Sequence, residues 1–470
     1  MKVAIIGAGI GGISTAWLLS PTHEVDVYEA ESHLGGHTRT IDVDCGAGPF
    51  PVDTGFQVFN RRTYLNLTRF FERLGVTAID TDMTFSAQIR DADVEWAASG
   101  LSGLFAQRKN VANPRFLRMI ADILRLSRDA DRLLADPTVA DLTLGELMRR
   151  EGYGDIFTDW YLIPMGSAIW STPPGDMLDY PALTFLHFCD NHGLLHITGK
   201  PQWLSLPGGA RRYVAAAARS FSGEVFENEP VERVERMGEG VLVSTATRSR
   251  RYDAAVFATH PPETRAILAG AMTAAEHRVL GAFGYWPNDV VVHTDESFLP
   301  RRRRAWSSWN WYSATSDLSK ATLVLTYRIN SLQEVPDGSP TVLETLNRDR
   351  EPAAGTVLAE LSFTHPMYSR SAIAAQERLA EIQGTDRLWF AGAWTRYGFH
   401  EDGMLSGVRV AEALGATVPW GDELDATRTL ARADAPMPML GQTRKLHKSE
   451  LPRVAGQQAP GGAPRAGARE

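Results

Sequence analysis

The sequence predicts an α/β protein in which a dinucleotide-binding domain, built from separated segments, carries an inserted α+β domain. Residues 3–12 place an apolar strand directly before a G-x-G-x-x-G turn. Short β-favouring runs that suit the same domain recur at 225–234, 240–246, 252–258 and 388–390. A helix-rich stretch at 114–161 and β-favouring runs between 285 and 365 suit a second domain. At 470 residues, the chain is also too long for one simple core.

The first turn contains Gly7, Gly9 and Gly12, followed by an expected helix over 13–19. Gly7 permits the tight turn, Gly9 lets a pyrophosphate approach the backbone, and Gly12 lets the helix pack close to the strand. Glu29 ends the next apolar run, where its carboxylate can accept hydrogen bonds from ribose hydroxyls. We therefore predict a Rossmann-like βαβ unit that binds an adenine dinucleotide. The turn alone leaves NAD and FAD open.

Composition excludes several classes of protein. The net charge is −8 with both signs interspersed, so nothing indicates a nucleic-acid partner. Cys45 and Cys189 are the only cysteines, which argues against a disulfide framework or a cysteine metal site, and we expect no bound metal. We find no apolar run approaching the roughly 20 residues needed to span a bilayer, and we expect no signal peptide before the first strand.

The chain divides into discontinuous parts. We expect the dinucleotide-binding domain at 1–60, 205–285 and 385–420, and the substrate-binding domain at 61–204 and 286–384. The composition then shifts to Pro, Gly, Ala and Arg, which predicts a disordered tail at 422–470.

Further glycine-rich signals follow the first turn. Gly35-Gly36 allows backbone to pass close to phosphate, and His37 or Arg39 could supply positive charge. A polar turn, Val52-Asp53-Thr54-Gly55-Phe56, comes next. Near the C-terminus, LWFAGAW (388–394) is followed by GFHEDGM (398–404).

Together these motifs resemble the flavin-dependent amine oxidase and phytoene desaturase superfamily, from Met1 to about Gly415. The stretches VDTGFQVFN, GSAIWSTP, LPGGARRYV and YGFHEDG are more closely similar to a bacterial subgroup of predicted NAD/FAD-binding proteins. Genes of that subgroup often lie beside cyclopropane-fatty-acid-synthase-like methyltransferases. The resemblance implies a Rossmann-like FAD-binding domain of the GR2 or amine oxidase type, with the flavin ring at the interface with the substrate domain.

The resemblance also implies roles for individual residues. Those expected to hold the ADP portion of FAD are Gly7, Gly9, Gly12 and Glu29, with the backbone of Val231 near adenine. Those expected at the pyrophosphate, ribityl chain or ring are Gly36, His37, Gly55 and Phe56, and on the C-terminal flavin segment Gly392, Asp402, Gly403 and Met404.

The chain departs from the family pattern in ways that bear on the cofactor. Many amine oxidases have Arg at the position of His37 and Glu at that of Ala393, so Glu401 or Asp402 is a candidate for the ribityl contact. Neither cysteine lies near the C-terminal segment, so we expect noncovalent FAD. No second G-x-G-x-x-G follows a later strand, which disfavours a separate NAD(P)H domain.

Candidate catalytic residues follow the last strand. Trp394, Tyr397 and Phe399 lie where the family places aromatic rings against the flavin, although plain core packing explains them equally well. His400 precedes two acids that could orient its imidazole and raise its basicity, which would suit a general base. Alternatively, His400 only hydrogen-bonds the loop.

Residues 115–132 have a two-faced helical pattern. One side carries Arg115, Arg118, Asp122, Arg125, Arg128 and Arg132, and the other Phe116, Leu117, Ile120, Ile123 and Leu124. Such a helix either packs its apolar face on the domain or lies on an anionic membrane surface. The run Arg301 to Arg304 suggests a solvated turn. We expect a cytoplasmic protein, with peripheral contact at the inner membrane face as an open alternative.

The leading hypothesis is an FAD-dependent oxidoreductase that dehydrogenates, desaturates or otherwise oxidises a small hydrophobic substrate. A lipid or fatty-acyl substrate is suggested by family association alone. One alternative is a flavin amine oxidase that produces an imine and hydrogen peroxide, because fold does not determine the reaction. An alternative of another class is a noncatalytic flavoprotein partner of a lipid-modifying methyltransferase.

Overall fold

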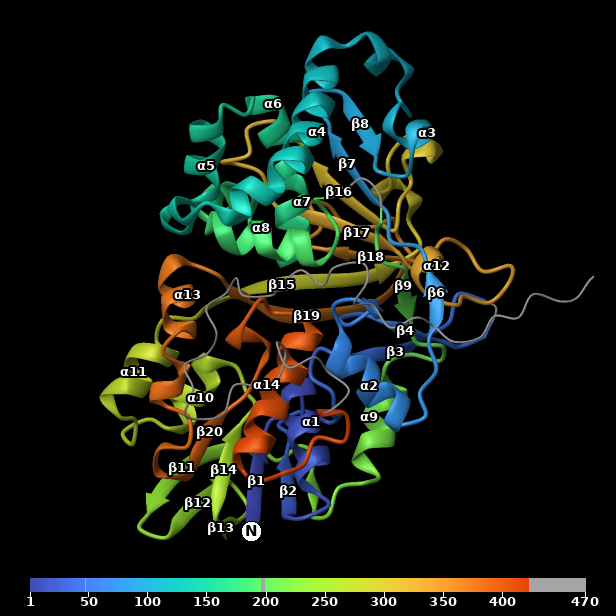
Figure 1. Ribbon diagram of the computed structural model, residues 1–470. Helices are drawn as coiled ribbons and strands as arrows, with labels where there is room; N and C mark the ends of the chain where they lie inside the picture. Colours follow the sequence, from blue (N-terminus) through green and yellow to red (C-terminus); the bar gives the residue numbers. More distant parts are fainter. Residues whose placement is uncertain (47, 196–198, 422–470) are drawn as a thin grey trace, which may run out of the picture.

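A computed structural model describes residues 1–46, 48–195 and 199–421. Figure 1 shows two halves, a parallel sheet with its helices near the N-terminus and a larger sheet with a separate group of helices above it. This mixture of parallel and antiparallel sheets with helices confirms the predicted α/β class. The predicted disordered tail lies outside the described residues.

The half near the N-terminus is built on five parallel strands in the order β10-β2-β1-β14-β20. They are β1 (Lys2–Ile6), β2 (Glu24–Tyr28), β10 (Val225–Phe226), β14 (Ala254–Phe257) and β20 (Leu388–Phe390). β1 is central and almost wholly buried, as expected for a parallel strand covered on both faces. The first and the last strand of the described chain therefore lie in one sheet, with β14 between them.

Helices and a small antiparallel sheet complete this half. The helices are α1 (Ile10–Leu19), α2 (Leu65–Arg73), α9 (Arg211–Ala218), α10 (Pro261–Ile267), α11 (Ala274–Leu280), α13 (Arg370–Gln376) and α14 (His400–Ala413). The small sheet contains β11 (Val231–Met237), β12 (Gly240–Thr245) and β13 (Ser249–Tyr252). Both helices that border the glycine turns begin three residues earlier than expected, α1 at Ile10 and α14 at His400.

The other half contains a seven-stranded sheet in the order β19-β15-β18-β17-β16-β7-β8. Its strands are β7 (Phe85–Ile89), β8 (Val94–Ala97), β15 (Gly284–His293), β16 (Trp309–Ser313), β17 (Val324–Arg328), β18 (Leu343–Leu346) and β19 (Val357–Met367). All its strand pairs are antiparallel except β7 with β16, which joins two distant parts of the chain.

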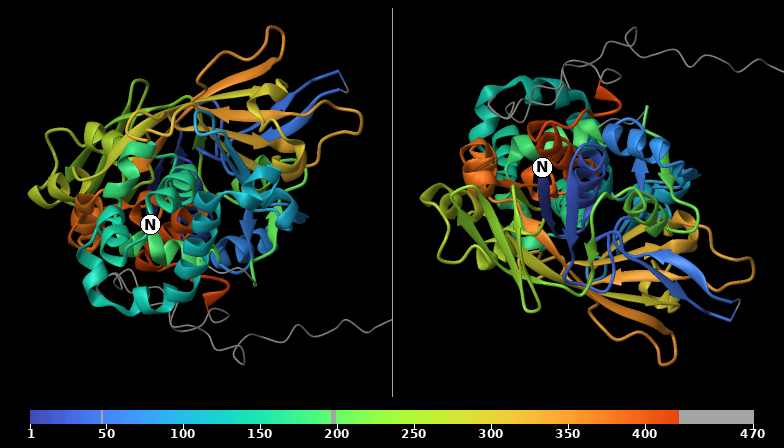
Figure 2. Two further views of the ribbon diagram at one scale, coloured as in Figure 1. Left: turned by 90° about the horizontal axis from the view of Figure 1, so that it is seen from above. Right: turned by 90° about the horizontal axis from the view of Figure 1, so that it is seen from below.

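A group of helices packs on this sheet, and seen from above they lie to one side of its yellow and orange strands (Figure 2). They are α3 (Leu101–Leu104), α4 (Pro114–Ala135), α5 (Leu144–Glu151), α6 (Asp155–Phe157), α7 (Ile163–Trp170) and α8 (Ala182–Asn191). Within the described ranges, none of the helices is long and apolar enough to cross a membrane.

Short elements lie between the halves. They are β3 (Thr40–Val43), β4 (Phe50–Asp53), β5 (Phe59–Asn60), β6 (Ile79–Thr81), β9 (Trp203–Ser205) and α12 (Ile329–Leu332). β3 pairs with β4, and β9 joins β5 to β6. Through β9, the segment before α9 is connected to the segment after β4.

The predicted division of α4 into a basic and an apolar side is confirmed only in part. Phe116 is buried and Ile120 and Ile123 pack against the same core, but Leu117, Leu124 and Asp122 lie on the side opposite to the one expected. The side chains that α4 buries are Phe116, Met119, Asp122, Leu126, Ala130 and Leu133. The buried carboxylate of Asp122 has a partner on this face, since it accepts a hydrogen bond from Arg118 Nε at 3.1 Å. Leu117 and Leu124, which were expected on the packed side, are exposed.

Candidate functional site

The turn between β1 and α1 uses each of its glycines differently. Gly7 has a φ of +94°, which favours glycine, and its N–H donates to the Tyr28 carbonyl oxygen at 2.8 Å. A Cβ at Gly12 would lie 2.0 Å from the Gly7 carbonyl oxygen, so the close start of α1 requires glycine. A Cβ at Gly9 would have no atom of the described residues within 4 Å. Gly9 therefore faces open space at the N-terminus of α1.

Glu29, directly after β2, connects this turn to the next strands. Its Oε2 accepts from the Ala8 N–H at 2.8 Å, and its Oε1 accepts from the Glu31 N–H at 3.0 Å. The Glu29 carbonyl oxygen accepts from the Glu229 N–H at 2.9 Å, two residues before Val231. The carboxylate predicted to bind ribose and the strand predicted to face adenine thus come from neighbouring segments. Each carboxylate oxygen keeps a further lone pair for a hydroxyl.

α14 lies directly against α1, as Figure 1 shows. A Cβ at Gly403 would lie 2.6 Å from Ile10 Cγ2, and one at Gly407 would lie 2.6 Å from the Gly11 carbonyl oxygen. A Cβ at Gly11 would in turn lie 3.2 Å from the Gly392 nitrogen. These contacts make the helices parallel, with both N-termini at the same end. That end carries the unpaired N–H groups and partial positive charge of two helices.

The two other glycine motifs meet at this end. A Cβ at Gly36, where φ is +55°, would lie 3.2 Å from Gly9 Cα. A Cβ at Gly55 would lie 2.1 Å from the His37 carbonyl oxygen, and the same oxygen accepts from the Phe56 N–H at 2.9 Å. The structure therefore places Gly36, His37, Gly55 and Phe56 close together, beside Gly9.

His400, the first residue of α14, is held by neutral groups. Its Nε2 lies 2.9 Å from Thr38 Oγ1 and 3.4 Å from the Tyr213 hydroxyl oxygen. Its ring stacks on Phe56 with centroids 3.8 Å apart and planes 15° apart. Burial, with a smaller effect of His37, lowers the pKa of His400 to about 3. The imidazole is therefore neutral near pH 7.

The expectation that the two following acids orient His400 and raise its basicity is wrong. Glu401 accepts from the backbone N–H groups of Asn66 and Leu67 at 3.0 and 2.9 Å, at the start of α2. Asp402 accepts from the Phe399 N–H at 3.0 Å and so caps α14 itself. The carboxylates that were candidates for the ribityl chain thus make helix-capping contacts, and their role toward the ribityl chain stays a prediction.

Two other predicted cofactor residues, Met404 and Arg39, differ in their surroundings. The side chain of Met404 is fully buried in the core that also contains Val256 and Ile13. The carbonyl oxygen of Arg39 accepts from the Thr54 N–H at 2.9 Å. Arg39 as a whole residue is partly exposed.

The candidate aromatic residues point into different cores. Trp394 packs edge-on against Phe283, with centroids 4.7 Å apart, in the core beneath β14 and β20. Tyr397 and Phe399 lie against Phe188 of α8, at centroid distances of 6.0 and 4.6 Å. Burial raises the pKa of Tyr397 to about 12. Trp394 thus fits the core-packing alternative, whereas Tyr397 and Phe399 face the substrate half.

Sequence reasoning missed a group of neutral rings around His37. Its centroid lies 5.7 Å from that of His260, 5.3 Å from that of His365 and 5.2 Å from that of Phe363. Burial lowers the pKa of His37 and His260 to about 4 and that of His365 to about 3. The available signals were the position of His260 just after β14, at the carboxyl edge beside β1, and the alternation of Phe363 with His365 on β19.

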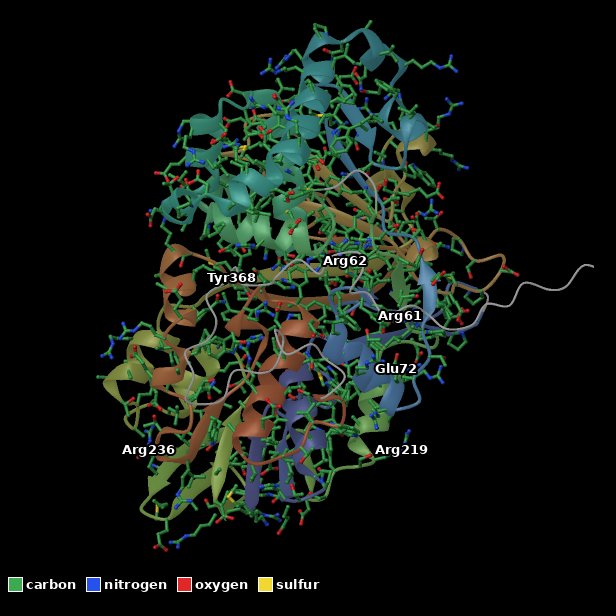
Figure 3. The ribbon with its side chains drawn as sticks, viewed as in Figure 1. Arg61, Arg62, Glu72, Arg219, Arg236 and Tyr368 are labelled. Carbon is green, nitrogen blue, oxygen red and sulfur yellow. The ribbon has the colours of Figure 1, made fainter. Side chains whose placement is uncertain are left out.

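Tyr368 is a second residue that the sequence did not single out. It follows β19 at the boundary between the two halves (Figure 3), and a Cβ at Gly398 would lie 2.5 Å from its hydroxyl oxygen. Only glycine therefore lets the Tyr397–Phe399 turn pass this close to Tyr368.

The residues at this site fit FAD. Open space at Gly9, next to two parallel helix N-termini, suits an anionic pyrophosphate. The Nε2 of His37 is buried without a partner among the described residues, as expected when a cofactor atom completes its hydrogen bond. The residues that would hold FAD are the backbone of the three glycine motifs, Glu29 and the N-terminus of α14.

Comparisons with known proteins agree with this site. The family model described as flavin containing amine oxidoreductase matches residues 10–341. A Mycobacterium tuberculosis protein named as a flavin-containing monoamine oxidase is 24% identical over 356 residues, covering 72% of each chain. The zeta-carotene desaturase of Zea mays is 31% identical over 204 residues, 41% of this chain and 33% of that one.

A solved structure shows the same fold. The CLA-producing fatty acid isomerase from P. acnes superposes with a TM-score of 0.65 at 12% identity, covering 87% of this chain and 98% of that chain. The match to the family model spans well over half of the chain. The chain therefore belongs to the flavin-containing amine oxidoreductase family and is an FAD-dependent oxidoreductase.

Proposed function

We propose that this oxidoreductase removes hydrogen from a hydrophobic substrate, namely a lipid or fatty-acyl chain. The observation that carries the proposal is the set of aromatic rings where the flavin-binding residues meet the substrate half. Phe399 stacks on Phe188, Phe56 stacks on His400, and Phe363 packs against His37. Sites that bind apolar molecules are lined mainly by such rings, with few polar groups.

The polar groups among these rings support the same substrate class, because they are neutral. Burial lowers the pKa of His37, His260, His365 and His400 to about 3 or 4. Glu344 of β18 is buried, which raises the pKa of its carboxyl well above the ordinary value. Its Oε2 lies 2.9 Å from Gln57 Nε2, next to Phe56 in sequence. A charged amine that entered this site would lose its hydration, and none of these neutral groups would supply an ionised carboxylate as its partner.

The protein's part in the reaction is binding and orientation. FAD, when bound, accepts a hydride or its equivalent from a C–H bond of the substrate. The rings of Phe188 and Phe399 would hold an acyl chain and exclude water. Thr38 and Tyr213 fix the imidazole of His400, so the substrate meets a neutral ring at the start of α14.

Oxidation of an amine to an imine is a second candidate. The M. tuberculosis protein that shares 72% of this chain's length carries the name monoamine oxidase, and aromatic walls can also hold an uncharged amine. Such a substrate would have to enter deprotonated, since the groups described above are neutral. This candidate predicts a rate that rises with pH toward the pKa of the amine.

Anaerobic reduction of the bound flavin distinguishes the candidates. Purified holoprotein is mixed with fatty-acyl lipids, amines or NADPH, and absorbance at roughly 450 nm is followed, where oxidised flavin absorbs. Bleaching by acyl lipids is the expected result. Bleaching by amines alone would establish the second candidate, and bleaching by NADPH alone would contradict both.

Substitution of Phe363 tests the location of the substrate. Phe363→Ala removes a ring beside His37, so we expect slower flavin reduction at low lipid concentration and a raised KM. Val357→Ala, on the same strand but at its exposed start, is the matched control and should reduce at the normal rate. Equal rates for the two variants would remove β19 from the substrate site.

A further inference from the structure

The substrate half exposes apolar side chains at one end. Leu101 is 75% exposed, Val111 58%, Leu124 50% and Leu117 43%. These come from α3, from the adjoining 3-10 turn η1 (Arg108–Ala112) and from α4, which packs on η1. Figure 1 shows α3 and α4 at the end of the molecule opposite the N-terminus. In the described part of the chain, nearly half of the large exposed hydrophobic side chains therefore come from residues 101–124.

Positive charge surrounds the same elements. An open groove of about 590 Å³ is lined by Ala106, Gln107, Arg108, Lys109, Arg302, Arg303 and Arg304. Arg302 pairs with Glu95 at 3.0 Å, and Lys109 pairs with Asp93. Among the described residues, Arg108 and Arg304 have no acidic group within ion-pair distance. The predicted solvated turn at 301–304 is thus one wall of a cationic groove.

α4 joins the apolar and the cationic features. Leu117, Leu124 and Arg128 are spaced seven and four residues apart, so they lie on one face of the helix. All three side chains are exposed, because α4 packs on the domain through a different face. The exposed face therefore presents two leucines followed by an arginine, and this arginine also pairs with Asp129 at 3.0 Å.

We propose that this end of the molecule, formed by α3, η1, α4 and Arg302–Arg304, binds the surface of an anionic lipid bilayer. Leucine side chains that stand among arginines match the interface of a membrane, where apolar groups enter the acyl boundary and cations meet lipid phosphates. The core of a protein–protein interface is instead depleted of charge. The chain as a whole carries a net charge of −8, so an anionic surface repels most of the molecule. The cations at this end therefore turn this end, and no other, toward such a surface.

Vesicle co-sedimentation tests this inference with the full-length, flavin-loaded protein. We expect it to pellet with vesicles of phosphatidylglycerol and phosphatidylcholine and to remain in solution with phosphatidylcholine alone. Arg108→Glu with Arg304→Glu should weaken binding at least about tenfold, because each surface cation is worth about 1 kcal/mol. Separately, Leu117→Glu with Leu124→Glu should weaken binding as well, because these side chains can no longer enter the acyl boundary. High salt should weaken binding as well.

Two controls carry the same substitutions elsewhere. Val357→Glu replaces an exposed apolar side chain on β19, and Arg219→Glu reverses a charge in the half near the N-terminus (Figure 3). Both should bind vesicles like the unmodified protein. The inference would be overturned if the unmodified protein did not pellet with anionic vesicles. It would also be overturned if both double variants bound these vesicles as well as the two controls do. The same would follow if glycerol phosphate bound while vesicles did not. Since the test measures binding, its outcome is independent of which substrate reduces the flavin.

Discussion

At the scale of single residues, two glycines of one motif are needed for different physical reasons. Gly12 has no room for a side chain, since its Cβ would overlap the Gly7 carbonyl oxygen at 2.0 Å. Gly9 has room, with a φ of −69° that any residue adopts. Gly12 is thus required by the fold, and Gly9 by what occupies the space beside it.

This difference predicts two separable phenotypes. Gly9→Val should fold with an unchanged Tm as apoprotein but bind FAD at least about tenfold more weakly, because its side chain fills the space for the pyrophosphate. Gly12→Val should fail to fold or lose several kcal/mol of stability. Thermal unfolding and flavin content of both variants check this. Full flavin occupancy in Gly9→Val would show that the cofactor lies elsewhere.

Which parts of the site could be predicted depended on how local each signal was. The turn at Gly7, Gly9 and Gly12 was predictable because its geometry depends on residues next to each other in sequence. The group of His37, His260 and His365 was not, because it comes from three elements whose approach depends on strand order and register. The surroundings of His400 were predicted wrongly because local sequence does not show where a carboxylate points.

At the scale of elements, α1 and α14 form the most constrained contact of the flavin half. Gly407→Ala would place a methyl group 2.1 Å from Ser14 Oγ and 2.6 Å from the Gly11 carbonyl oxygen. We expect a loss of about 1–3 kcal/mol in the free energy of unfolding, measured in urea. Gly238→Ala, where a Cβ meets nothing described within 4 Å, should stay within about 0.5 kcal/mol. Equal stabilities would mean that the two helices can separate without cost.

The contact of α14 with α2 gives a second prediction. In Glu401→Gln, one oxygen that accepts a backbone N–H is replaced by an NH₂ group, which leaves that buried donor unpaired. The expected loss is about 1–3 kcal/mol in unfolding free energy. Glu72→Gln removes an exposed carboxylate of α2 that pairs with Arg69, and should change stability by less than about 0.5 kcal/mol. A stable Glu401→Gln protein would show that α2 does not need this cap.

Helices and strands could be predicted where the apolar periodicity was strong. Their bounds and buried faces were predicted wrongly where contacts with distant residues determine them. The start of α14 was expected at Gly403. Here Asp402 caps the helix at Phe399, and the close approach of α1 requires the interior glycines. The exposed side of α4 was likewise misassigned in part, since Asp122 is buried with the apolar residues.

At the scale of the whole molecule, the protein buries imidazoles in neutral form. His37, His192, His260, His293, His365 and His400 all have a pKa lowered to about 3 or 4 by burial. The unfolded chain takes up these protons near pH 6.5, about the ordinary pKa of histidine. Between pH 6.5 and 4 the unfolded state therefore binds more protons, so each of these histidines lowers stability as pH falls.

His293 allows this effect to be measured away from the flavin. It lies on β15 and hydrogen-bonds Thr345 at 2.8 Å, a contact that glutamine can replace. Between pH 7 and 5, His293→Gln should lose less stability than the unmodified protein, with a difference that grows by at most about 1.4 kcal/mol per pH unit. Buried acids such as Asp53 titrate in the opposite sense, so the comparison between variants is the informative quantity.

The exposed His277 provides the control for that comparison, because His277→Gln changes a side chain in water. This variant measures the effect of replacing a histidine at the surface. If His293→Gln lost stability with falling pH as steeply as the unmodified protein, burial would not hold His293 neutral.

The parallel pairing of α1 with α14 also has a consequence for synthesis. β1, the Gly9 turn and α1 are synthesised before their neighbours β14, β20 and α14, which follow with residues 254–257 and 388–413. Until those residues are made, the nascent chain must keep an apolar βαβ unit without its final partners. Because the proposed flavin site includes β20 and the N-terminus of α14, we expect flavin to bind only after both have been made. A chain that stops before residue 388 should therefore not retain flavin.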